Sequence, residues 1–375
     1  MANIYQDGFE WIPTAIGSGS VPSTEMVKGG WYLNLVSAQY FFVSNGRFGY
    51  GKSMQVSASS IYGWVSNYIK TFPDQGTPAE GFIGMAMRRD SVSDVLGWHG
   101  FAFYDALADA AQISIIFGRN GVIKVVNGSP GSNTQFNSIT ALASSKAGSF
   151  DENTWFHVEA RVLISGTVGT IEVRINTVPV IQLTATNTKT TTHTYFDSVA
   201  LIAGSGATSA GTVGYWDDLF VNDTSGTTNN TWTGNARVKT QFMTANGATD
   251  NFLLGGSAPA STNWQSVLNQ ALDDTKYVYS ATINDIDFYA PDPIINAPLV
   301  RAVQLRSGLR QDDATQRQSK HALRIGATTY LATPTFFTTQ TYSQYFSRWD
   351  LSPSTGVSFT AAEVNGFQTG LKLTA

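Results

Sequence analysis

Short segments in which apolar and polar residues alternate recur along this chain, and they constrain its fold more than any other feature. Examples are residues 53–59, 81–88, 155–164, 170–176, 215–221 and 236–243. Clusters of Gly, Asn, Ser and Pro separate such segments, which follow one another about every ten residues. A period of two is that of a β-strand, and this spacing is typical of antiparallel sandwiches, so the pattern predicts an all-β fold. One short helix is predicted near 360–368, where Thr360 and Glu363 form a capping-box pattern.

A polar, turn-rich run, DTSGTTNNTWTGN at residues 223–235, follows a well-marked strand segment and indicates a domain boundary. We therefore expect two β-domains, a larger one at residues 1–225 and a smaller one at residues 226–375.

The composition excludes several classes of function. Charged residues make up 13% of the chain, and its formal net charge is -4, which argues against nucleic-acid binding through clustered Lys and Arg. The chain has no cysteine, so disulfides, thiolate metal sites and thiol nucleophiles are excluded. It has no apolar run long enough for a membrane span, and its start does not resemble a signal peptide. We expect a protein that is made in a cytoplasm and does not insert into a membrane.

Residues 46–53, GRFGYGKS, match the phosphate-loop pattern G-x-x-x-x-G-K-[ST] letter for letter. A working phosphate loop leads into a helix, whose N-terminus binds the phosphate groups. Here Met54, Val56 and Ala58 alternate with polar residues, which predicts a strand. We therefore interpret the stretch as a glycine-rich hairpin turn, and we expect no nucleotide and no other cofactor.

Residues 155–176 form the clearest hairpin pattern in the chain. Its first strand places Phe156 and the alternate residues after it on one face, and His157, Glu159 and Arg161 on the other. The second group could be part of an acid–base or metal site. A solvated ladder of cross-strand charges is the favoured interpretation.

Asp217 and Asp218 are adjacent in a predicted strand, so we expect their side chains to point to opposite faces and not to form a catalytic pair. We expect one of them to accept a hydrogen bond from a neighbouring loop, and a calcium-ligand role for either stays open. The four histidines, His99, His157, His193 and His321, lack metal-binding spacing, and no metal is predicted. Without a recognisable catalytic motif, the chain is not expected to be an enzyme.

Aromatic residues in glycine-rich loops are the candidate binding residues. GRFGYG contains Arg47, Phe48 and Tyr50, and LGWHG contains Trp98 and His99. Their alternative role is core packing, since each aromatic side chain can bury about 150–250 Å². If exposed, they could contact sugar rings or a protein partner.

Two stretches carry a resemblance to known families. FDENTWFHVEARVLISGTVGTIEVRINTVPV resembles a segment of laminin-G/concanavalin A-like jelly rolls, although Thr177 stands where those proteins usually have glycine. GTVGYWDDLFVNDTSG and its continuation, with SFTAAEVNGFQTGLKLTA at residues 358–375, resemble virion proteins of tailed bacteriophages of the tail or decoration type. That group has a concanavalin-like domain followed by a second β-domain.

The resemblance implies a concanavalin/laminin-G-like sandwich followed by a smaller β-sandwich, in a virion assembled in the host cytoplasm. It implies a non-enzymatic structural component of the tail, fibre or baseplate, with host-surface glycan or protein binding as an additional role. A capsid decoration protein and a polysaccharide-degrading enzyme are the alternatives. The implied partners are other virion proteins and further copies of this chain, with a trimer as one candidate form and a host glycan as a candidate ligand.

Overall fold

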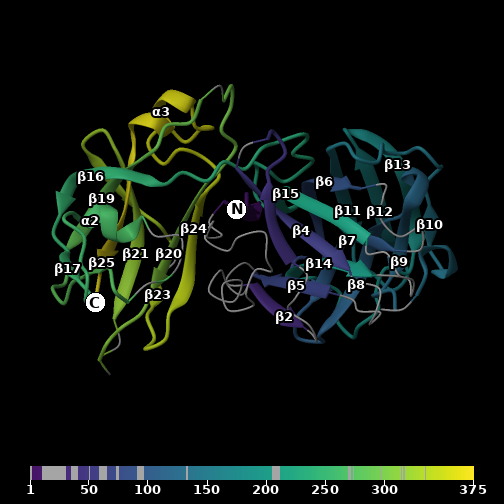
Figure 1. Ribbon diagram of the computed structural model, residues 1–375, viewed down its shortest axis with the longest axis horizontal. Helices are drawn as coiled ribbons and strands as arrows, with labels where there is room; N and C mark the ends of the chain where they lie inside the picture. Colours follow the sequence, from purple (N-terminus) through teal and green to yellow (C-terminus); the bar gives the residue numbers. More distant parts are fainter. Residues whose placement is uncertain are drawn as a thin grey trace. The chain divides into compact units, whose positions relative to one another are not determined.

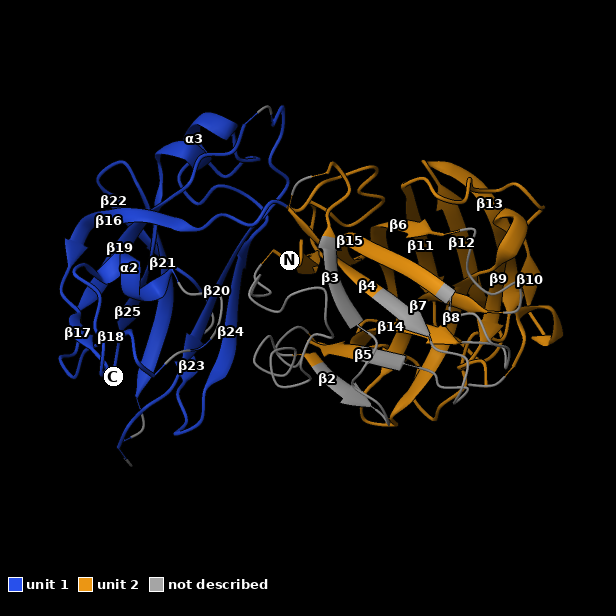
Figure 2. Ribbon diagram, viewed as in Figure 1, with its two compact units in different colours: residues 1, 239–375 blue, residues 2–238 orange. Residues whose placement is uncertain are grey.

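The computed structural model divides the chain into two compact units, Ala2–Val238 and Lys239–Ala375 (Figure 2). The residues that it describes are 2–10, 31–34, 41–49, 51–58, 66–72, 76–90, 97–131, 134–204, 212–268, 272, 274–295, 297–313, 315, 317–333 and 335–375.

Two antiparallel sheets form the N-terminal unit (Figure 1). Within the described ranges, the first sheet contains in spatial order β13 (Val178–Thr186), β12 (Gly169–Ile175), β11 (Phe156–Leu163), β6 (Glu80–Arg89), β15 (Thr212–Asp223), β4 (Lys52–Ala58) and β3 (Phe41–Asn45), while β1 (Asn3–Asp7) also pairs with β15. The second contains β10 (Ala143–Ser144), β9 (Ile123–Asn127), β8 (Ala110–Phe117), β7 (Trp98–Asp105), β14 (Ser198–Gly204), β5 (Ser66–Thr71) and β2 (Trp31–Asn34).

The inner faces of the two sheets meet in an aromatic core. Phe117 on β8 lies 5.6 Å from Phe156 on β11, and His99 on β7 lies 5.9 Å from Trp216 on β15, measured between ring centroids. All four side chains are at most 2% exposed. Such contacts across two antiparallel sheets define a sandwich.

The outer face of the second sheet is also covered. Trp98, Ala102 and Ile116 belong to a buried cluster that includes Phe136 and Ile139 from the segment after β9. The indole N–H of Trp98 donates to the carbonyl of Thr134 at 3.1 Å. This cover explains why both faces of the sheet are apolar.

The GRFGYGKS stretch forms a hairpin turn, as predicted. The amide of Gly49 donates to the carbonyl of Gly46 at 3.0 Å, and Gly49 and Gly51 both have a φ of +76°. Strand β4 begins at Lys52, directly after the turn, and the hydroxyl of Ser53 donates to the carbonyl of Asn45 at 2.9 Å. A strand therefore stands where a phosphate loop requires a helix N-terminus.

The C-terminal unit is a smaller two-layer β-structure. In the part of it that the structure describes, one sheet has the order β16 (Met243–Asp250), β19 (Ile286–Pro291), β25 (Gln368–Leu373), β21 (Gln318–Ile325) and β22 (Thr328–Leu331), with β23 (Phe336–Phe337) also paired to β21. Two ribbons accompany it, β17 (Leu253–Gly255) with β18 (Tyr277–Tyr279) and β20 (Val303–Leu309) with β24 (Ser343–Trp349). The buried ring of His321 on β21 hydrogen-bonds the hydroxyls of Ser307 and Ser347, each at 2.9 Å, and so joins the sheet to the second ribbon. The predicted fold class, all-β with a larger sandwich followed by a smaller β-domain, is confirmed.

The two helices described are short, α2 (Asn263–Val267) and α3 (Ala361–Gly366). Helix α3 occupies the position predicted from the capping-box pattern, and the hydroxyl of Thr360 accepts a hydrogen bond from the amide of Glu363 at 3.1 Å. The carboxylate of Glu363 instead accepts hydrogen bonds from Ser352 and Ser354, so it joins the helix to the preceding turn.

Replacing the helix cap should weaken the C-terminal unit. Thr360→Ala removes the acceptor for the Glu363 amide, and we expect it to lower the free energy of unfolding by about 1 kcal/mol. Exposed Thr355 is a matched control, and Thr355→Ala should change the stability by less than about 0.5 kcal/mol. Urea denaturation followed by circular dichroism would measure both, and equal losses would contradict the capping role.

The division between the units falls later in the sequence than the boundary expected at residue 225. Residues 224–238, which we call the covering segment, belong to the N-terminal unit and contain no helix or strand. The strand predicted at 236–243 is therefore wrong, since β16 begins only at Met243. The amide of Val238 donates to the side chain of Asp218 instead of to a neighbouring strand.

None of the helices among the described residues has the length and apolar character needed to cross a membrane. Within those same ranges, no three His, Cys, Asp or Glu side chains gather in a way that could hold a metal ion.

Candidate functional site

The outward face of the first sheet contains a row of polar and aromatic side chains on neighbouring strands. Strand pairing places Gln55 beside Tyr215 and Tyr215 beside Arg88, and Trp155 directly precedes the start of β11 next to Arg88. The residues next to them in sequence, Met54, Trp216 and Met87, are fully buried. Because successive side chains of a strand point to opposite faces, these four residues face away from the core. We call Gln55, Tyr215, Arg88 and Trp155 the aromatic row. It crosses three strand spacings, or about 14 Å.

Arg88 is held between two aromatic rings and one carboxylate. Its guanidinium carbon lies 3.9 Å from the ring centroid of Tyr215 and 5.8 Å from that of Trp155. Its Nε lies 3.1 Å from the carboxylate of Asp90, which also accepts a hydrogen bond from the hydroxyl of Tyr215 at 3.0 Å. Burial, followed by the charge of Asp90, raises the pKa of Tyr215, so this hydroxyl keeps its proton.

Most of this cluster is partly accessible to solvent, whereas Tyr215 is 7% exposed. The Arg88 and Asp90 side chains are 28% and 21% exposed, and Trp155 and Gln55 are half-buried. Guanidinium and amide N–H groups donate hydrogen bonds, whereas carboxylate and amide oxygens accept them. The aromatic row with Asp90 can therefore bind a ligand whose hydroxyls do both, against an aromatic surface.

Beyond the aromatic row, the sheet face is irregular at Asp217 and Asp218. The pairing of β15 with β6 shifts between Asp217, opposite Ala86, and Phe220, opposite Gly84, so β15 contains one extra residue. Asp218 has a φ of +53°, and both carboxylates are at most 5% exposed. The expectation that the two side chains point to opposite faces is wrong, because regular alternation does not extend through a bulge.

The two carboxylates bind two different segments of the chain. Asp217 accepts a hydrogen bond from the amide of Arg47 in the glycine-rich turn, and Asp218 accepts one from the amide of Val238, each at 2.8 Å. Nη1 of Arg47 lies 3.7 Å from Asp218 and donates to the side chain of Asn235 at 2.6 Å. The expectation that one of these carboxylates hydrogen-bonds a loop is confirmed.

Burial is the main factor that opposes ionisation of the carboxyl pair, while the positive charges of Arg47 and Arg237 favour ionisation of Asp218. Burial and the adjacent Asp218 raise the pKa of Asp217, and burial raises the pKa of Asp218. Burial and the positive charge of Arg47 lower the pKa of His157 to about 3, so the imidazole is neutral near pH 7. Neither nitrogen of this ring has a hydrogen-bond partner among the described residues.

The covering segment lies on the rest of this sheet face. Trp232 packs edge-on against Phe82, with ring centroids 5.1 Å apart, and the Arg174 guanidinium lies 3.9 Å from its centroid. The amides of Thr233 and Gly234 both donate to Oε1 of Glu159, at 2.7 and 2.9 Å.

The charge ladder predicted on the hairpin is therefore mostly covered. His157 is fully buried and Glu159 is 1% exposed, so they do not form a solvated ladder. Strand pairing places Glu159 opposite Arg174 and Arg161 opposite Glu172, but Arg161 forms its ion pair with Glu80 and Arg174 forms one with Glu172 on its own strand.

The candidate binding residues from the sequence have different positions in the structure. Phe48 is 51% exposed, with the guanidinium groups of Arg47 and Arg237 at 5.2 and 5.0 Å from its ring centroid. Arg47 is half-buried and binds the carboxyl pair, and Tyr50 lies outside the described residues.

The expectation that Trp98 and His99 face a ligand is wrong, since both are fully buried. Trp98 lies beneath the segment after β9, and His99 points into the sandwich. The nearby glycine in LGWHG does not mark a surface loop. A Cβ at Gly100 would lie 1.9 Å from the carbonyl of Ile115, so glycine permits close approach of two strands.

The residues of the aromatic row were missed because each belongs to a different segment of the sequence. The only local signal was the alternation of apolar and polar residues, which predicts that Tyr215 and Trp155 lie on the opposite face from the residues that follow them. Strand order brings them together, and that order is not visible in the sequence.

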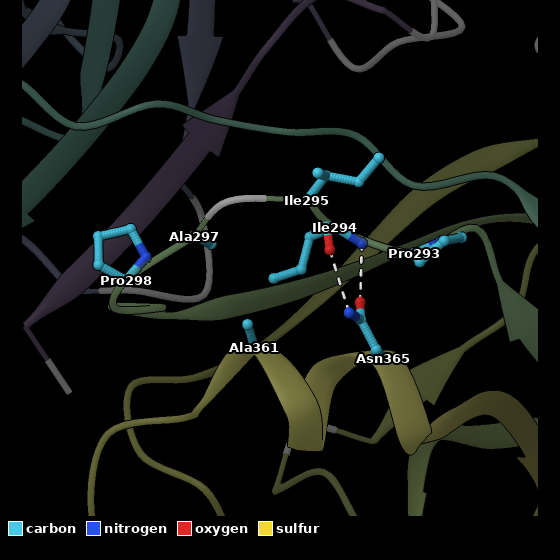
Figure 3. A pocket seen from close by; sticks show the side chains of 7 residues that line it. All are labelled: Pro293, Ile294, Ile295, Ala297, Pro298, Ala361 and Asn365. Atoms are coloured by element: carbon cyan, nitrogen blue, oxygen red, sulfur yellow. Dashed lines mark hydrogen bonds between the residues drawn. The ribbon is translucent and has the colours of Figure 1, made fainter.

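The C-terminal unit has a separate shallow hollow of about 760 Å³ (Figure 3). Its lining residues are Pro293, Ile294, Ile295, Ala297, Pro298, Ala361 and Asn365. The polar side chain among them, Asn365, forms two hydrogen bonds with the backbone of Ile294, at 2.7 and 3.0 Å. The hollow therefore offers mainly apolar surface to a ligand.

No family model and no curated protein matches the chain. Among solved structures, the chain is similar to alginate lyase vAL-1 from Chlorella virus, with 11% identity over 59% of this chain and 99% of that one and a TM-score of 0.39. It is similar to an endo-1,3-beta-glucanase from Streptomyces sioyaensis, with 11% identity, coverage of 59% and 95%, and a TM-score of 0.37. For a carbohydrate esterase from Shiga toxin-encoding bacteriophage phi24B, the identity is 14%, the coverage 52% and 91%, and the TM-score 0.34.

These comparisons correct the function expected from the sequence. The similar structures are carbohydrate-active proteins, among them the polysaccharide-degrading alginate lyase and endo-1,3-beta-glucanase, which fall in the third class considered above. The prediction that the chain functions as a structural virion component, with capsid decoration as its alternative, is therefore wrong, while the separate expectation that it is not an enzyme stays a prediction. At these identities the likeness is one of fold.

Proposed function

We propose that the N-terminal unit recognises a glycan at the aromatic row. The observation that carries this proposal is the arrangement of Trp155, Arg88, Tyr215 and Asp90, which combines aromatic surface with fixed donors and acceptors on an accessible sheet face. The Arg88 charge is already balanced by Asp90, so the site favours hydroxyl-rich neutral sugars over strongly anionic ones.

The binding proposal predicts a large effect of one aromatic substitution. Trp155→Ala removes the half-buried ring at the end of the row and should raise the dissociation constant for the bound oligosaccharide at least about tenfold. Trp264→Ala is the matched control, because Trp264 is also half-buried but belongs to the C-terminal unit. A glycan array would identify the oligosaccharide, and calorimetry would measure its affinity for each variant.

Arg88→Lys tests the planar donor group separately, because it keeps the charge and removes the fork of N–H groups. Equal affinities of wild type, Trp155→Ala and Arg88→Lys would contradict the assignment of the site. Binding of no neutral or acidic glycan on the array would contradict the function itself.

Glycan cleavage is the second candidate function. It is favoured by the raised pKa of Asp217, a carboxyl two residues from Tyr215 that could serve as a general acid only if a substrate reached it. Its low exposure and its hydrogen bond from the Arg47 amide favour binding instead. The expectation that the chain is not an enzyme remains a prediction, and shortening of the bound polysaccharide by purified protein would contradict it.

The sequence resemblance supports a proposed place of action. We infer that glycan recognition takes place on the particle of a tailed phage, where the chain contacts other virion proteins and further copies of itself. Mass spectrometry of purified particles tests the location, and light scattering of the isolated protein tests the homo-oligomer. Absence of the chain from the particles would contradict this location.

A further inference from the structure

The carboxyl pair at the β15 bulge joins three parts of the N-terminal unit that are far apart in sequence. Asp217 binds the backbone of the glycine-rich turn through Arg47, and Asp218 binds the end of the covering segment through Val238. Side-chain contacts of Arg47 with Asn235 and Asp218 connect the turn to the covering segment directly. The turn and this end of the covering segment therefore depend on the same two carboxyl groups.

The charge balance at this point depends on protonation of the pair. The charged or titratable groups around it are Arg47 on the turn, Arg237 on the covering segment, Glu10 after β1, Lys52 on β4, which interacts with Glu10, and His157 in the same row on β11. His157 is neutral near pH 7 and contributes no positive charge. With one proton on the pair, a single buried negative charge faces Arg47 and Arg237. Without this proton, both adjacent carboxylates are charged while buried, and Glu10 adds to the repulsion at Asp217.

We propose that loss of this proton loosens the glycine-rich turn and the covering segment, so that the outward face of the first sheet opens as the pH rises. This pH response does not depend on the proposed glycan function, because it concerns only how the glycine-rich turn and the covering segment are held on the sheet.

The direction of the pH effect follows from linkage. The pKa values of Asp217 and Asp218 are raised in the folded protein above those of an unfolded chain, so the native state holds more protons between the two values. The stabilisation is fully present below the ordinary carboxyl pKa and is lost as the pH rises through the raised values. The two adjacent carboxylates then repel each other, and this repulsion weakens their hydrogen bonds to the glycine-rich turn and to the covering segment.

The proposed pH response can be tested by hydrogen exchange of the full chain. Exchange is measured from about pH 5 to about pH 9 and corrected for the intrinsic exchange rate. In wild type, protection of residues 46–49 and 224–238 should fall by at least about tenfold, the factor that corresponds to one pKa unit. Protection of β8, which lies in the core, should stay constant and serves as the internal reference.

Asp218→Asn is the matched variant. Asparagine tolerates the positive φ of this position and keeps an acceptor for the Val238 amide, but it removes one of the adjacent charges. Protection should fall less in this variant than in wild type, because only one carboxyl is left to ionise and its repulsion with Asp218 is gone, although burial still raises the pKa of Asp217. An equal fall in both proteins, or no fall in wild type, would overturn the proposal.

A second measurement on wild type does not depend on folding of the variant. In carboxyl ¹³C NMR, one aspartate should titrate well above the ordinary range for this residue, together with amide shifts in the turn and covering segment. Titration of every aspartate below about pH 5 would overturn the proposal.

Discussion

Phe117→Ala should lower the free energy of unfolding of the N-terminal unit by about 3–5 kcal/mol. Phe117 is fully buried at the centre of an aromatic cluster that joins both sheets. Its ring lies within 6.4 Å, between centroids, of His99, Phe101, Phe150 and Phe156. Truncation would leave a cavity among rings whose strands fix their positions, so little of the lost contact can be recovered.

Phe48→Ala is the control for Phe117→Ala. It removes the same number of atoms from a side chain that is 51% exposed on the glycine-rich turn, and we expect a loss below about 1 kcal/mol. Urea denaturation monitored by circular dichroism gives both values. If the two variants differed by less than about 1 kcal/mol, the aromatic cluster would not be the main core of the sandwich.

The sequence was sufficient to predict those elements whose signal is local. Residues 169–175 alternate strictly between buried and more exposed positions, and they pair with residues 156–163 in the predicted hairpin of β11 and β12. Helix α3 was predictable for the same reason, because Thr360 and the amide that it caps are three residues apart. The alternation of apolar and polar residues after Ser53 correctly predicted a strand after the glycine-rich turn, although the turn itself matches a phosphate-loop pattern.

Features that depend on distant partners could not be predicted in this way. The extra residue at Asp217 is defined by its pairing with β6, and the adjacent aspartates alone do not reveal it. Residues 224–238 have the composition of a linker, but the buried carboxylate of Glu159 binds their amides and holds them on the sheet. Trp98 has a loop-like sequence context but lies under a segment that starts more than thirty positions later, at Thr134.

Glu159→Ala should release the covering segment. Glu159 is 1% exposed and accepts hydrogen bonds from two consecutive amides, so its removal leaves both donors without this acceptor. Hydrogen bonds to a charged group contribute about 1.5–3 kcal/mol, and we expect a loss of roughly 2–4 kcal/mol in the free energy that holds the segment closed. Hydrogen exchange of residues 224–238 should accelerate by about 30-fold or more, since 1.4 kcal/mol corresponds to a factor of ten.

Glu172→Ala separates this effect from a general loss of negative charge on the same sheet face. The Glu172 side chain is 21% exposed and pairs with Arg174 on its own strand, so its removal should cost at most about 1 kcal/mol and leave exchange of the covering segment nearly unchanged. Equal acceleration in both variants would show that Glu159 has no special role. Glycan affinity gives a further distinction, because the aromatic row does not include Glu159. Release of the segment should preserve binding that Trp155→Ala weakens, and a parallel loss in both variants would mean that the ligand also contacts the covered part of the face.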